Sequence, residues 1–309
     1  MSTPNTIPAS SDPHVFLIGR PPIGELLGFI RTMTTDGQRV DLASVTTEWR
    51  TANDHVLRLE TTESGVADNP PVEALPDALR EAAESLFADS MFRRAYQSVP
   101  TEIAQIDLDR LVVFQKFINL TYVEELKRRL GPSPSLASIF RFALPLTPDQ
   151  PPFHIMQNSQ NMYTLLSTST DFRFLEAQIL QPQSVTAFES TGRPVAILAL
   201  GIGYGSNLLN ALHVENRLVL SNGSHRAYAL RDLGIRQIPC LIQRISRRDE
   251  LELVAGGDFG ANPDRYLKSS RPPMLRDYFD PALRKVFPVY RKNRVVRLQF
   301  GVEQSDIPV

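Results

Sequence analysis

Five consecutive residues, Asn222 to Arg226, bring together backbone and side-chain groups that suit the binding of an anion. The pair Asn222-Gly223 tolerates positive φ and therefore favours a tight turn. A turn that leads into a helix leaves backbone N–H groups at the positive end of the helix dipole, and His225 and Arg226 add side-chain donors there. A guanidinium can bind two oxygens of one ligand at the same time. We therefore expect an anion, and in the first place a phosphate, at this turn.

The residues on either side of the turn predict the elements that hold it. Leu218 to Leu220 form a short apolar run, which indicates a strand that ends at the turn. Ser224 is a residue type that caps helices, and Gly234 is typical of the position that closes one. Apolar residues from Ile238 to Ile242 predict a second strand. In this unit of strand, glycine turn, helix and strand we expect the following residues to be buried: Leu218, Leu220, Ala229, Leu230, Leu233, Ile238 and Leu241.

The turn and its surroundings resemble the signature of the ParB/sulfiredoxin-like superfamily, which combines a glycine turn, an arginine, an LG pair and an IP pair. The matching residues are Asn222-Gly223-Ser224-His225-Arg226, Leu233-Gly234-Ile235 and Ile238-Pro239. Upstream, two stretches resemble the opening strand and the first helix of that superfamily: Ile106 to Leu111 and Tyr122 to Leu126. The resemblance spans residues 105–245, with a large unmatched segment between its ends. It implies an α+β fold with a ParB/sulfiredoxin-like core.

The resemblance also implies a ligand. In ParB-type CTPases and in the free-serine kinases of this fold, the equivalent turn binds nucleotide phosphates. The implied cofactor is ATP, ADP or CTP with Mg²⁺, and the residues that would bind it are Asn222, Gly223, Ser224, His225 and Arg226. Sulfiredoxins have their catalytic cysteine in this turn, where this chain has Ser224, so sulfinic-acid reduction is not expected. The serine kinases have Asp where this chain has Asn222, and no metal ligand is assigned.

The function expected from this resemblance is a nucleotide-dependent phosphotransferase or nucleotide hydrolase, with a small molecule or a protein as acceptor. Phosphoryl transfer generally needs a group that orients the nucleophile. The candidate catalytic residues are His225, Glu124 and Glu125, and Asp107 and Asp109 are further carboxylates. Two alternatives remain open, a non-catalytic, nucleotide-gated or DNA-linked binding module and a nuclease. A carboxylate beside the bound phosphates would distinguish the enzyme from the binding module.

Composition limits the partners. The 309 residues carry a net charge of −1, so no overall basic field attracts nucleic acid or an anionic membrane. Nucleic acid stays a possible partner that the charge does not favour. The single cysteine, Cys240, excludes an intramolecular disulfide. No apolar run is long enough to span a bilayer and no signal peptide is recognisable, so we expect a cytoplasmic protein without a membrane partner, preceded by a short disordered leader over residues 1–14.

The chain divides, by its patterns, into a helical N-terminal region (1–100), a ParB/sulfiredoxin-like core (101–248) and a C-terminal extension (249–309). Two alternating stretches, Asn161 to Leu166 and Phe172 to Leu175, predict a β-hairpin inserted in the core. The spacing Gly201-x-Gly203-x-Gly205 resembles the glycine loop of methyltransferases. Because no acidic residue for a ribose follows the next strand, we interpret it as a flexible connection between two strands.

Overall fold

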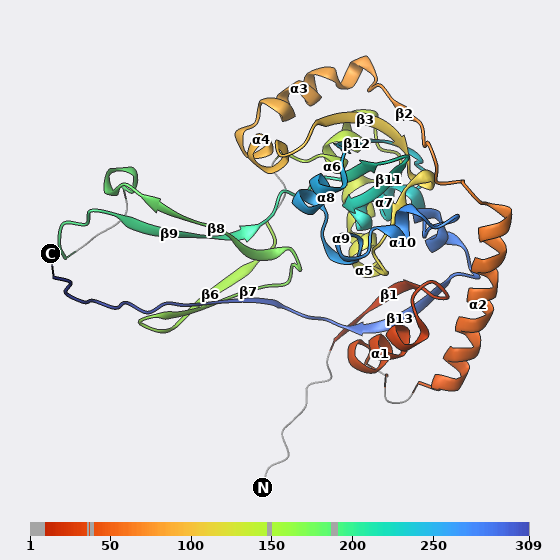
Figure 1. Cartoon of the computed structure of the whole chain (residues 1–309), viewed down its shortest axis with the longest axis horizontal. Coiled ribbons are helices and arrows are strands. Elements are labelled where there is room, and N and C mark those ends of the chain that lie inside the picture. Colours follow the sequence, from red (N-terminus) through yellow and green to blue (C-terminus); the bar gives the residue numbers. More distant parts are fainter. Residues whose placement is uncertain (1–9, 36, 38–39, 147–149, 187–190, 309) are drawn as a thin grey trace, which may run out of the picture. The chain divides into compact units, whose positions relative to one another are not determined.

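The computed structural model describes residues 10–35, 37, 40–146, 150–186 and 191–308. These residues form helices and β-sheets in an α+β arrangement, as the sequence predicts (Figure 1). They separate into two compact units. Unit 1 holds the described residues of 1–147 and 207–291, and unit 2 holds those of 148–206 and 292–309.

This division differs from the one expected from the sequence. Residues of the region 1–100 share unit 1 with most of the region 101–248, and the region 249–309 is divided between the two units at residue 291. Strand β2 (Val72–Glu73) shows why, because it pairs with β3 (Thr101–Asp107) across the expected boundary. Residues 1–9 of the expected leader lie outside the described residues. Ser11 to His14 belong instead to strand β1 (Ser11–Leu17), where backbone pairing and burial of the apolar end fix them.

A six-stranded sheet forms the centre of unit 1, with the strand order β2-β3-β12-β10-β11-β4. Its members beyond β2 and β3 are β12 (Gln237–Ile245), β10 (Asn210–Val214), β11 (Arg217–Asn222) and β4 (Val112–Val113). Strands β10 and β12 are parallel, whereas β10 and β11 form an antiparallel pair. The strands expected on both sides of the glycine turn are therefore β11 and β12, and β10 lies between them.

Helix α7 (Ser224–Asp232) follows β11, close to the limits expected from the sequence. Of the seven residues expected in the core, six are buried and Leu233 is partly exposed. Helix α7 packs against α5 (Leu120–Leu130) and α6 (Leu136–Ala143), and the buried faces of all three belong to the main core. Leu230 is completely buried there, because its side chain lies on the face of α7 that is covered by the sheet and the neighbouring helices.

A second sheet of unit 1 has the order β13-β1-β5, with β13 (Arg284–Tyr290) and β5 (Phe117–Asn119) on either side of β1. Figure 1 shows β1 beside β13. Residues distant in the chain meet here, since β1 pairs with β13 along its whole length. Helices α1 (Ile23–Met33) and α2 (Leu42–Thr62) contribute to an apolar cluster with this sheet. The remaining α-helices of unit 1 are α3 (Arg80–Ala88), α4 (Ser90–Tyr96), α8 (Arg248–Val254), α9 (Gly257–Ala261) and α10 (Asp264–Leu267).

Unit 2 consists of two small antiparallel sheets. One has the order β14-β7-β6, from β14 (Arg294–Gln299), β7 (Met162–Ser167) and β6 (Phe153–Ser159). The other is a two-stranded ribbon of β8 (Phe172–Leu180) and β9 (Ile197–Tyr204). Both stretches of the expected hairpin are strands, but β7 and β8 do not pair with each other. Strand β7 pairs with β6 and β14, and β8 pairs with β9, and the sequence patterns did not predict these pairs.

The expected glycine loop is also part of a strand. Gly201 and Gly203 lie within β9, opposite Glu176 and Arg173 of β8, and Gly205 directly follows the strand. The interpretation of a flexible connection was wrong, because a spacing of two residues is also the spacing of one face of a strand. Among the helices of the described ranges, none is both long and apolar enough to cross a membrane.

Candidate functional site

The turn before α7 depends on Gly223. Its φ of 89° lies in the left-handed region, which residues with a Cβ rarely adopt. A Cβ at this position would also lie 2.9 Å from the Cα of Leu209. The backbone of the turn is therefore pressed against the segment that enters β10, and only glycine fits without movement of that segment.

Helices α5 and α7 run parallel, with their N-termini side by side. At the N-terminal ends, the backbone N–H of Asn119 donates to Nε2 of His225 over 3.0 Å, and the rings of Tyr122 and His225 meet edge to face at 5.4 Å. At the C-terminal ends, Nζ of Lys127 lies 2.6 Å from a carboxylate oxygen of Asp232. Two positive dipole ends consequently meet at one place on the molecule.

The imidazole of His225 is a structural link in this arrangement. Because Nε2 accepts a hydrogen bond from the Asn119 backbone, this nitrogen is unprotonated and the neutral ring carries its proton on Nδ1. Burial, reinforced by the nearby His14, lowers the pKa of His225 to about 4. The side chain is therefore neutral near pH 7 and does not offer a positive charge to an anion, although the sequence predicts it as a phosphate contact.

Arg226 is a buried residue of the first turn of α7, with 7% of its surface exposed. Its Nη1 donates to the backbone carbonyl of Asn207. Glu125, a possible structural partner for Arg226 on the sequence, pairs with Arg129 instead. The first turn of the helix thus carries a permanently charged side chain, whose guanidinium lies at the Asn207 carbonyl.

Three further residues are predicted to contact the phosphate: Asn222, Gly223 and Ser224. Their backbone amides are not all available to a ligand. Oδ1 of Asn222 accepts the N–H of Gly223 over 2.8 Å, so this amide is engaged within the turn. Ser224 begins the helix, and the first amide that bonds back to the turn is that of Ala227, to the carbonyl of Gly223 at 2.8 Å. The amides of Ser224 and His225 precede it in the first helical turn, where amides have no intrahelical partner.

The predicted carboxylates lie in ion pairs. Glu124 pairs with Lys127 over 2.9 Å, and Glu125 pairs with Arg129 one turn further along α5. Lys127 also pairs with Asp232 at the opposite end of α7 from the turn, and these bonds raise the pKa of its amine.

The two upstream aspartates have structural roles as well. Asp107 accepts the backbone N–H of Asp109 over 2.9 Å and so caps a short 3-10 helix, Leu108–Arg110. Asp109 in turn accepts from Nε of Arg231 over 2.6 Å and lies 3.4 Å from Nε of Arg236. This pairing fixes the C-terminal half of α7 to the strand that carries the cap.

A group of residues that the sequence did not single out lies beside the N-terminus of α5. Asp12 accepts from Nε of Arg291 over 2.8 Å, and Nδ2 of Asn119 lies 3.4 Å from its other oxygen. Burial disfavours the ionised form of Asp12, but the bonds from Arg291, Thr121 and Asn119 outweigh burial and lower its pKa. Asp12 is therefore joined to the N-cap of α5 through Asn119, and its lowered pKa keeps it ionised near neutral pH.

His14 lies directly opposite Asn119 in the pairing of β1 with β5. Burial lowers the pKa of His14, although the charge of Asp12 acts in the opposite direction. Its Nδ1 is buried and forms no hydrogen bond with the described residues. An asparagine ahead of an amphipathic stretch, as at Asn119, is a capping signal that a sequence offers. Asp12, His14 and Arg291 have no such signal.

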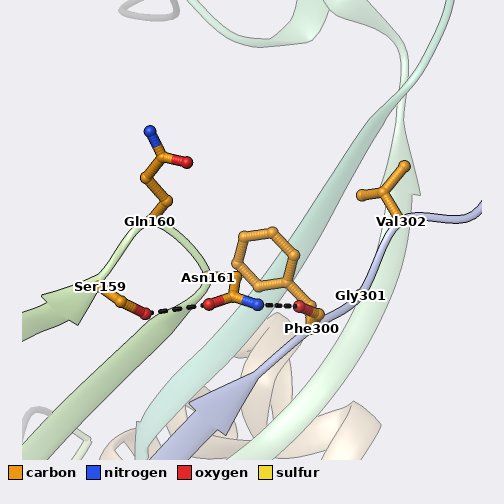
Figure 2. Close-up of a pocket in the computed structure, with 6 residues that line it drawn as sticks. All are labelled: Ser159, Gln160, Asn161, Phe300, Gly301 and Val302. Carbon is orange, nitrogen blue, oxygen red and sulfur yellow. Dashed lines mark hydrogen bonds between the residues drawn. The ribbon is translucent and has the colours of Figure 1, made fainter.

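No group of three or more His, Cys, Asp or Glu side chains within the described ranges is arranged to hold a metal ion. A hollow in unit 2 is of a different kind. Figure 2 shows it between the β6–β7 turn and the residues after β14, where Ser159 donates to Asn161 (2.9 Å) and Asn161 donates to the carbonyl of Phe300 (3.0 Å). The residues that line it are Ser159, Gln160, Asn161, Phe300, Gly301 and Val302, and none carries a charge.

Comparisons with known proteins add no relative: no family model, no curated protein and no solved structure matches the chain.

Proposed function

We propose that the protein is a binding module for a phosphorylated ligand, with a nucleotide as the favoured class, held where the first turns of α5 and α7 meet. The observation that carries this proposal is the parallel packing of the two helices, through Asn119 and His225 at one end and Lys127 and Asp232 at the other. Helix N-termini attract anions because their first amides lack intrahelical partners and their dipoles are positive.

The electrostatics of the junction support an anionic ligand. A single charge near one helix terminus gains about 0.3–1 kcal/mol, and two parallel termini act on the same ligand. Arg226, a buried residue of the first turn of α7, adds a full positive charge on a side chain that reaches the Asn207 carbonyl. Asp12 contributes a negative charge nearby, but Arg291 pairs with it. An anion bound at the junction would reduce the repulsion between Arg226 and the helix dipole.

The side-chain contacts favour binding over phosphoryl transfer as the proposed role. Glu124 and Glu125 are held in ion pairs on α5, and Asp12 already accepts bonds from Arg291, Thr121 and Asn119. The resemblance to the ParB/sulfiredoxin-like superfamily supports a nucleotide as the ligand, with Mg²⁺ bound to its phosphates. A ParB-type core and a nucleotide-gated partner remain part of this proposal, whereas nuclease and phosphotransferase activity are not favoured by a particular contact.

The test uses Ser224, the first residue of α7. In Ser224→Asp, a carboxylate stands at the positive end of the helix, so we expect a gain in stability of about 0.3–1 kcal/mol. The same carboxylate would occupy and repel the ligand position, so the affinity for ATP, ADP or CTP should fall at least ~10-fold, the order expected for a hydrogen bond to a charged group. Calorimetric titration with each nucleotide, with and without Mg²⁺, measures the affinity.

Ser224→Asn is the matched control, because it has the shape of Asp without its charge. We expect this variant to bind the nucleotide within ~3-fold of the unmodified chain, since hydrogen bonds to the backbone amides are retained. Equal affinity in Ser224→Asp and Ser224→Asn would contradict the site, and so would the lack of binding of every nucleotide to the unmodified chain.

A further inference from the structure

The sequence contains a single Asn-Gly pair, Asn222-Gly223. The side-chain carboxamide of an asparagine has an electrophilic carbon, Cγ, and the backbone nitrogen of the next residue can attack it to close a five-membered ring. Such an intramolecular reaction is fast only where the two groups are held close together. Glycine hinders the attack least, because it has no Cβ. This pair is therefore the place in the chain where the main chain is best able to attack a neighbouring side chain.

The structure exposes this pair to water. Asn222 is the last residue of β11 and is exposed, whereas the residues before it in the strand, from Arg217 to Leu220, are buried. Gly223 follows at once, and its backbone lies against Leu209. Water can consequently reach the carboxamide of Asn222, while the nitrogen beside it belongs to a backbone segment that packing holds in place.

A hydrogen bond brings the two reacting groups together. The backbone N–H of Gly223 donates to Oδ1 of Asn222 over 2.8 Å, so the nitrogen lies at the carboxamide that it would attack. Asn158 of β6 offers a comparison, since it too is exposed. Its Oδ1 accepts instead from the hydroxyl of Thr164 over 2.6 Å, and the residue that follows it, Ser159, carries a Cβ. Only Asn222 combines the contact with an unhindered nitrogen.

The position at the start of α7 favours the charges that this reaction develops. The Gly223 nitrogen must lose its proton before it attacks, and the attack then places negative charge on Oδ1 of Asn222. Gly223 is the N-cap of α7, so both charges develop at the positive end of the helix dipole. Backbone amides and dipoles that face a developing oxyanion lower the barrier to its formation. The helix end that suits a phosphate thus also suits this reaction.

We propose that Asn222 is a site of spontaneous deamidation. The Gly223 nitrogen forms a bond to Cγ of Asn222, the Cγ–Nδ2 bond breaks, and ammonia leaves with the proton from the Gly223 nitrogen. The product is a cyclic succinimide. Water, the only co-reactant, then opens the ring at one of its two carbonyl groups. Opening at Cγ gives an aspartate at position 222, and opening at the backbone carbonyl gives an isoaspartate, in which the main chain runs through Cβ and Cγ.

Both products place a carboxylate in the turn that precedes α7. This carboxylate would repel a phosphate at the same helix end, so the modification should lower the affinity for a nucleotide. A bound phosphate would in turn oppose the build-up of negative charge on Asn222 and slow the reaction. These effects on binding rest on the proposed function, whereas the covalent step does not.

The test follows the mass of one peptide during incubation of the folded, full-length chain at mildly alkaline pH. Cleavage after Arg217 and Arg226 releases residues 218–226, and mass spectrometry detects the replacement of the amide group by a carboxyl group. We expect the change at Asn222 to be at least ~10-fold faster than at Asn158 in the same sample, because its reacting groups are held together. Raising the pH should accelerate it further. An isoaspartyl methyltransferase with S-adenosylmethionine labels the isoaspartate product and distinguishes it from aspartate.

The matched control is Asn222→Gln, whose side chain is one methylene longer and cannot close the five-membered ring. Its peptide should keep its mass, and because position 222 is exposed the circular dichroism should be unchanged. An unchanged mass at Asn222 would overturn the proposal, as would equal rates at Asn222 and Asn158 or a slower reaction in the folded chain than in the chain unfolded by urea. Deamidation of a chain that binds no nucleotide would support this inference and contradict the proposed function alone.

Discussion

The chain has glycine in two places that each resemble a ligand-binding motif in sequence, and the two places differ in structure. At Asn222-Gly223 in unit 1, a positive φ and close contact with Leu209 make glycine necessary, and the turn positions α7 over a closed core. In β9 of unit 2, Gly203 adopts an ordinary strand conformation on a ribbon whose other face is open. A glycine motif therefore predicts a ligand-binding turn only where the backbone conformation demands glycine.

The difference in enclosure predicts the largest effect. Leu230→Ala in α7 removes a completely buried side chain from the main core, so we expect a loss of about 2–5 kcal/mol in unfolding free energy. Leu198→Ala in β9 truncates an exposed side chain, and the loss should stay within about 0.5 kcal/mol for the monomer. Urea denaturation at low protein concentration compares the two variants. Similar losses of unfolding free energy in the two variants would contradict the difference in burial between α7 and β9.

The burial of His225 also predicts that the free energy of unfolding depends on pH. The pKa of His225 is about 4 in the folded chain and near the usual histidine value of 6.5 when the chain is unfolded, so between these values the unfolded chain binds more protons. The contribution of the neutral ring is fully present above pH 6.5 and is lost as the pH falls to about 4. At 1.36 kcal/mol per pKa unit, it amounts to roughly 3 kcal/mol.

The check is the unfolding free energy measured from pH 7 to pH 4 for the unmodified chain and for His225→Gln. Glutamine retains an acceptor for the Asn119 backbone N–H but does not titrate. The variant should show a shallower fall than the unmodified chain. Parallel curves would mean that other groups, such as His14 and His213, whose pKa values burial also lowers, account for the whole dependence.

The two glycines themselves predict a smaller effect. Gly223→Ala combines a positive φ with a Cβ only 2.9 Å from the Leu209 backbone, so we expect a loss of about 1–3 kcal/mol. Gly203→Ala needs no unusual φ, and its Cβ would make an ordinary contact at 3.5 Å with Leu175. Because alanine is less flexible than glycine in the unfolded chain, this variant should be neutral or stabilised by up to about 1 kcal/mol. Thermal unfolding measures the stability of both variants. A Gly203→Ala variant less stable than Gly223→Ala would contradict the prediction.

The sequence predicts local features of this fold well and distant contacts poorly. Strand β11, the turn and α7 are predictable because capping, glycine and periodicity signals all lie within about twenty residues. The environment of the turn is not predictable in this way, because its contacts join distant residues. Asn119 and His225 are 106 residues apart, and Asp12 and Arg291 are 279 residues apart. Strand pairing in unit 2 has the same limit. The alternation in β7 and β8 predicts two strands, but not that each pairs with another segment.

The central claim, that a phosphate binds at the joined N-termini of α5 and α7, is tested most directly by amide chemical shifts of the isotope-labelled chain during titration with a nucleotide. The account predicts saturable shifts for the first-turn amides of both helices, Leu120 and Thr121 in α5 and Ser224 and His225 in α7, and their loss in Ser224→Asp. Saturable shifts confined to other parts of the chain, with these four amides unchanged, would contradict it.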